Sequence, residues 1–226
     1  MHDLVFSLGP NCKNAWNVRS HFGVRQAYPF DWWITPARAM LRMIEPGFVF
    51  HVAPDDLALT PVDSAGDNSV FNRRLNILQH HDFPRQGRLV TAVTEATIAQ
   101  LNAKYAALFA RMHAELAASR APLALLNGSH AGWSKDPAGQ GGLDPALNRR
   151  IPPAALIAEI RARLGAKLRV VVITKGEARQ EEVEGGVIIS RPDTGERHRD
   201  RGAPNYAEPV HVFRACYEAL GLGPAA

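Results

Sequence analysis

The sequence predicts an α/β protein with a mostly parallel, open sheet and helices on both faces. Short apolar runs typical of buried strands alternate with longer segments of helical periodicity, and this order favours parallel strands joined by crossover helices. A chain of 226 residues suits one domain with insertions, so we expect a single domain over residues 1–226. Hydrophobic residues make up 46% and charged residues 21%, which excludes wholesale disorder.

The N-terminal part of the chain predicts a strand, a turn and a helix. Residues 4–8 form an apolar run that ends at Gly9 and Pro10, as a buried strand followed by a turn does. A helix is expected next, with Asn11 as its N-cap and Gly23 as its stop.

The middle of the chain carries the strongest helix signal. Residues 94–119 place apolar side chains at helical spacing along one stripe, and a shorter helix is expected at residues 36–44. Residues 53–68 are rich in Asp, Pro and small side chains, so they predict a loop. Residues 71–83 fit neither the helical nor the strand period.

The C-terminal half continues the alternation of strands and helices. We expect buried strands at residues 123–126, 168–174 and 187–190, and helices at residues 153–164 and 210–220. Residues 128–153 are rich in Gly and Pro and lack a period, so they predict a lid or an inserted loop.

Charge and composition exclude several classes of partner. The formal net charge is +4, but even the densest basic run, residues 191–201, mixes Arg with Asp and Glu, so no nucleic-acid surface is predicted. No stretch approaches the roughly 18 apolar residues of a membrane span, and the first residues do not resemble a signal peptide. We therefore expect a cytoplasmic protein that binds neither nucleic acid nor membrane.

Cys12 is the first candidate for chemistry. The chain has two cysteines, Cys12 and Cys216, and free thiols are expected in a protein that builds its own core. In the first turn of a helix, Cys12 would feel the positive end of the helix dipole, which lowers a thiol pKa. Backbone amides, with Asn11 as a further donor, would receive an oxyanion. A packing cysteine beside Ala15 and Trp16 fits the same spacing.

The turn at Gly9 also suits an anion, because a glycine-containing turn between a strand and a helix is a general anion site. The three-glycine pattern of dinucleotide folds is absent there, so no cofactor is predicted. Asn127 and His130 follow the strand expected at residues 123–126, at the strand end where α/β proteins commonly bind ligands. A plain turn explains these two residues equally well.

His80, His81 and Asp82 are a further candidate. One imidazole would serve as general base to a thiol, with a carboxylate holding its tautomer, and neighbouring strand residues point to opposite faces, so only one histidine is expected at a site. No partners stand at zinc-ligand spacing, so no metal is predicted. Asp31 lies among aromatic residues, including Trp32, and is expected to pair with an arginine or backbone amides, or to be functional.

Three motifs together resemble a bacterial family of uncharacterised proteins described as papain-like cysteine peptidases. They are Ser-Leu-Gly-Pro-Asn-Cys at residues 7–12, Ala-Tyr-Pro-Phe-Asp-Trp at residues 27–32 and His-Asp-Phe at residues 81–83. Beyond the third motif, only the long helix and the strand after it are similar. The resemblance implies an α+β papain-like fold as the alternative to the parallel sheet.

The resemblance also implies a cysteine peptidase or a related thiol-dependent acyl hydrolase or transferase. Cys12 would be the nucleophile and His81 the base, acting on a peptide or a small acyl or amide substrate. Asp31 or Asp82 would orient the imidazole. We expect further substrate contacts from Gly9, Asn11, Trp32, Asn127 and His130.

Two other functions stay open from the sequence. One is a Rossmann-like transferase or hydrolase that binds an anionic ligand at the turn from Gly9 to Cys12, in which case Cys12 would tolerate replacement. The other is a non-catalytic binding domain whose aromatic cluster is only core. In that case Cys12 would be unreactive and His81 distant from it.

Overall fold

The computed structural model describes residues 2–128, 133, 136–139, 143–192 and 210–223, and it has an α/β architecture whose largest sheet is mostly parallel. This main sheet has the order β1-β8-β9-β11-β10. Its strands are β1 (Leu4–Ser7), β8 (Pro122–Asn127), β9 (Arg169–Lys175), β10 (Arg179–Val183) and β11 (Gly186–Arg191). All neighbours pair in parallel except β10, which is antiparallel to β11 at the edge. The carboxyl ends of β1, β8, β9 and β11 therefore meet along one side of the sheet.

Helices cover both faces of the main sheet, as the sequence predicts. On one face lie α1 (Cys12–Phe22) and α6 (Val210–Ala219), and on the other lie α2 (Ala37–Met43), α3 (Glu95–Ala118) and α5 (Pro153–Leu164). The side chains of β8 show the division, because Leu123 and Leu125 pack with α1 and α6 while Ala124 and Leu126 belong to the larger core.

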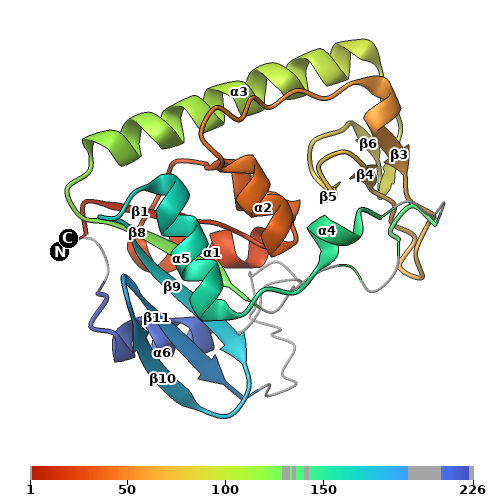
Figure 1. Ribbon diagram of the computed structural model, residues 1–226. Coiled ribbons are helices and arrows are strands. Elements are labelled where there is room, and N and C mark those ends of the chain that lie inside the picture. The colour runs from red at the N-terminus through yellow and green to blue at the C-terminus, as the bar shows by residue number, and fades with distance from the viewer. Residues whose placement is uncertain (1, 129–132, 134–135, 140–142, 193–209, 224–226) are drawn as a thin grey trace.

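A second, antiparallel sheet lies in the chain between α1 and α3, and the sequence does not predict it. Its order is β2-β5-β4-β3, with β2 (Trp33–Ile34), β3 (Leu57–Leu59), β4 (Val70–Asn72) and β5 (Ile77–Gln79). A separate hairpin is formed by β6 (Arg85–Gln86) and β7 (Leu89–Val90). The loop expected at residues 53–68 is therefore wrong in part, because it contains β3. Figure 1 shows α3 running past both sheets.

One hydrophobic core serves both sheets. It joins Phe6 and Leu126 of the main sheet to Trp33 of β2 and Ile77 of β5. The long helix α3 contributes Tyr105, whose ring centre lies 4.1 Å from that of Trp33. The small sheet is thus packed on the same apolar interior as the parallel one.

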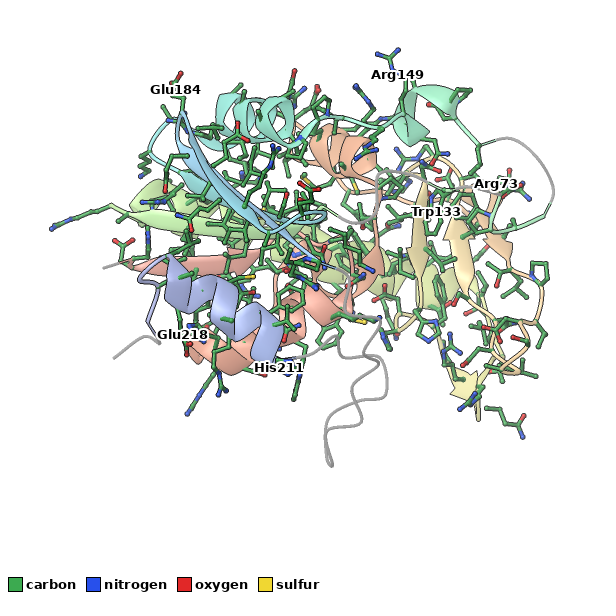
Figure 2. All side chains as sticks on the ribbon, turned by 90° about the horizontal axis from the view of Figure 1, so that it is seen from below. Arg73, Trp133, Arg149, Glu184, His211 and Glu218 are labelled. Carbon is green, nitrogen blue, oxygen red and sulfur yellow. The ribbon has the colours of Figure 1, made fainter. Side chains whose placement is uncertain are left out.

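Most element boundaries fall where the sequence places them. The Asn11 side chain caps α1 by accepting hydrogen bonds from the amides of Lys13 and Asn14, and Gly23 ends the helix with a φ of +67°. The other predicted helices and strands are confirmed to within one residue at each end. In the inserted loop, the described residues include α4 (Pro145–Asn148) and Trp133, which lies beside the small sheet (Figure 2).

A buried carboxylate joins the end of the small sheet to α3. The side chain of Asp82, which follows β5, has no exposed surface. It accepts hydrogen bonds from Trp33 Nε1 at 2.9 Å and from the Tyr105 hydroxyl at 2.9 Å, and Lys104 Nζ lies 2.7 Å away. These donors replace the water that a carboxylate would otherwise need.

Replacing Asp82 by Ala removes the shared acceptor and leaves buried donors unpaired. We expect the free energy of unfolding to fall by about 2–4 kcal/mol, measured by urea denaturation followed by tryptophan fluorescence. The control is Asp55→Ala, because Asp55 is exposed, and its effect should stay within ~0.5 kcal/mol. If both variants are equally stable, Asp82 does not hold the small sheet in place.

Candidate functional site

Cys12 is the first residue of α1, directly after the turn that leaves β1. In this turn Gly9 has a φ of +86°, which glycine adopts without strain, and the bond from Gly9 to Pro10 is cis. The Oδ1 atom of Asn11 accepts from the amides of Lys13 at 3.1 Å and Asn14 at 3.4 Å. Among the described residues, the amide of Cys12 has no acceptor after this capping.

The predicted thiolate at Cys12 is wrong for the resting protein. Cys12 is half-buried, and burial raises its pKa above the ordinary value. The amides of Cys12 and Lys13 and the charge of Lys13 oppose this effect but are smaller. Cys12 therefore rests as a protonated thiol at neutral pH, and it needs a base to become a nucleophile.

The two histidines after β5 do not point to opposite faces as expected, because they follow the strand rather than lie in it, and their rings pack edge-on with 4.9 Å between centres. The Nδ1 atom of His80 lies 2.6 Å from Ser69 Oγ and 3.4 Å from an Arg85 nitrogen. His81 is exposed, and its ring packs edge-on against Trp32 with 5.7 Å between centres. Desolvation lowers the pKa of both histidines, and His80 lowers that of His81 further. His81 is therefore neutral at neutral pH and able to accept a proton.

A series of contacts joins α1 to His81. Arg19, two turns after Cys12, forms an ion pair with Asp31 at 2.7 Å, and its guanidinium lies 5.2 Å from the centre of the Trp32 ring. The Trp32 ring in turn contacts the His81 ring. The second and third motif segments thus contact each other, and the second contacts α1, although no hydrogen bond between Cys12 and a histidine occurs within the described residues.

The two candidate carboxylates have partners other than histidine. Asp31 accepts a hydrogen bond from the Tyr28 amide at 3.0 Å in addition to its bond with Arg19, which confirms the expected arginine and backbone partners. Burial nevertheless raises the pKa of Asp31. Asp82 accepts hydrogen bonds from Trp33 of β2 and from residues of α3. In the described part of the chain, neither carboxylate is hydrogen-bonded to an imidazole. Their orienting role stays a prediction.

A cavity of about 250 Å³ opens at the carboxyl ends of β1, β8 and β9. The connection after β1 leads to α1 on one face of the sheet, whereas the connection after β8 leads to α5 on the other. Such a divergence leaves a crevice in which α/β proteins bind ligands. Of the predicted contact residues, Asn127 lines this cavity, while Gly9, Asn11, Cys12 and Trp32 do not. His130 lies outside the described residues.

Four polar residues of the cavity were not predicted as site residues, namely Thr35, Arg150, Thr174 and Lys175. Lys175 is the last residue of β9, so the strand-end rule that indicates Asn127 would also have found it. Thr35 comes from a short connection that no sequence pattern marks, and Arg150 comes from the lid or inserted loop predicted at residues 128–153, in which no pattern singles it out. Their position depends on tertiary packing.

Comparisons of the chain with protein-family models, curated proteins and solved structures gave no match. In the part of the chain that the structure describes, no three His, Cys, Asp or Glu side chains are grouped so that they could bind a metal ion. None of the helices described there has both the length and the apolar character needed to span a bilayer.

The raised pKa of Cys12 predicts its alkylation profile. In a Cys216→Ser variant, the rate of reaction with iodoacetamide should rise with pH to a midpoint above that of the same cysteine in guanidinium chloride, because burial favours the protonated thiol. Mass spectrometry of quenched samples measures the rate. A folded-state midpoint below the unfolded one would show that the helix N-terminus outweighs burial.

Proposed function

We propose that the protein is a thiol-dependent acyl hydrolase or acyltransferase with Cys12 as its nucleophile and His81 as its general base. The observation that carries the proposal is the position of Cys12 at the start of α1. There the thiol of the half-buried Cys12 lies beside its own backbone amide, which donates to no acceptor in the described part of the chain. A nucleophile beside an oxyanion donor is the arrangement that acyl transfer requires.

His81 suits the role of base better than its neighbour does. His80 is engaged with Ser69 and Arg85, whereas His81 is exposed and contacts Trp32, whose ring also lies near Arg19 of α1. A substrate lying along Trp32 would contact both the helix and the imidazole. The order of Cys12 before His81 is also that of papain-like enzymes, so the resemblance of the three motifs supports the same assignment.

The protonation states determine the order of events. The Cys12 sulfur attacks the acyl carbonyl carbon while its proton passes to His81, and the Cys12 amide hydrogen-bonds the oxyanion that forms. Collapse of this intermediate expels the alcohol, thiol or amine, which takes the proton from His81, and the acyl group stays on the sulfur. Water or a second nucleophile then removes the acyl group, which gives hydrolysis or transfer.

Acylation by p-nitrophenyl acetate tests the proposal. We expect a burst of p-nitrophenolate at neutral pH and one acetyl group on Cys12, found by peptide mass spectrometry, and both should be absent in Cys12→Ala. His81→Gln should slow the burst by roughly 10²-fold or more, because the protonated thiol loses its base.

Two matched variants serve as controls. Cys216→Ser removes the other thiol, and His80→Gln makes the same change as His81→Gln at the adjacent position; both should keep most of the burst. A full burst in Cys12→Ala would exclude Cys12 as nucleophile. Equal losses in the two histidine variants would exclude His81 as the specific base.

A further inference from the structure

We propose that the cavity at the carboxyl edge of the main sheet binds a small organic anion with an apolar body and one phosphate or carboxylate group. Cys12 does not line this cavity, so the proposal is independent of the acyl chemistry. Three features of the cavity support the proposal: a buried hydroxyl without a hydrogen-bond partner, cationic side chains in the lining, and apolar side chains in the rest of the lining.

The unpaired hydroxyl belongs to Thr35, which follows β2. Its side chain lines the cavity, it is 1% exposed, and its Oγ1 atom has no hydrogen-bond partner. Its backbone amide is already used, because it donates to the Pro10 carbonyl at 2.8 Å. A buried hydroxyl without a partner is costly and rare. An oxygen atom of a ligand in the cavity would accept the hydrogen bond that Thr35 lacks.

The charge of the cavity is positive. Arg150 and Lys175 line it, and none of its described lining residues is acidic. Arg150 is exposed and forms no ion pair within the described ranges, so its guanidinium is available to a ligand. The Arg150 guanidinium therefore favours an anion in the cavity, because a guanidinium matches the geometry of phosphate and carboxylate groups.

The N-terminus of α5 adds to the positive charge at the cavity. Pro153 and Leu156 of its first turn line the cavity, and no side chain caps this helix at its N-terminus. The positive end of the helix dipole therefore lies beside the same space as Arg150.

The rest of the lining is apolar, with Met40, Leu126, Ile151 and Val172 among its members. A volume of about 250 Å³ leaves room beyond a single phosphate or carboxylate group. Apolar walls with a few polar groups are typical of sites for small organic molecules. The geometry thus fits a ligand whose body packs on these side chains and whose anionic group contacts Thr35 and Arg150.

Calorimetric titration with phenyl phosphate, benzoate and benzyl alcohol tests the proposal, because the three probes share a ring and differ in the polar group. We expect saturable binding of at least one anion and weaker or no binding of benzyl alcohol. Tighter binding of phenyl phosphate would assign a phosphate, and tighter binding of benzoate a carboxylate. If neither anion binds better than benzyl alcohol up to roughly millimolar concentrations, the proposal is overturned.

Matched charge variants locate the binding. Arg150→Gln should raise the Kd about tenfold or more. Arg149→Gln removes the same charge from the adjacent residue, which does not line the cavity and projects from the surface in Figure 2, so it should leave the Kd unchanged. Equal effects of the two variants would overturn the assignment.

Thr35→Val separates binding from folding. Because Oγ1 has no partner in the unliganded protein, this variant should weaken anion binding about fivefold or more without lowering thermal stability. Unchanged binding with lower stability would assign Thr35 a structural role only and contradict the proposal. Cys12→Ala should bind the anion normally, so a failure at Cys12 would be distinguishable from a failure here.

Discussion

The buried carboxylate of Asp82 is the contact on which the position of the small sheet depends. A carboxylate cannot leave water without donors, and those of Asp82 come from β2 and from α3. The end of β5 is thereby fixed against the helix that also covers the main sheet. His81 directly precedes Asp82, so the same contact determines that its imidazole lies on the Trp32 side.

Secondary structure was predictable where an element was long enough to show its period. The strands β8 and β9 are continuous apolar runs because parallel strands are covered on both faces. The strands β2 and β3 have two and three residues, too few for an alternation to be recognised. In β2, Trp33 packs on Tyr105 of α3, and in β3, Ala58 packs on Phe71 of β4, and such tertiary packing leaves no local pattern.

In the candidate site too, features with a local cause were predictable from the sequence, and features that depend on tertiary packing were not. The capping by Asn11 and the arginine partner of Asp31 follow from the chemistry of each residue, and they were predictable. The pKa of Cys12 was not, because the helix dipole is a local effect whereas the opposing burial comes from the whole fold. The place of Asn127 at a strand end was predictable, but most of the cavity lining was not, since Thr35 and Arg150 line one cavity only after distant parts of the chain have packed.

The outer strand β10 of the main sheet affects whether copies of the protein can associate through their sheet edges. The outer strand β10 exposes Arg179, Glu181 and Glu182, and the turn after it carries Glu184 outward (Figure 2). An outer strand offers unpaired backbone groups to any other strand, and charged side chains discourage that addition. On the β10 side, the apolar strands inside the sheet are therefore protected from pairing with a strand of another copy.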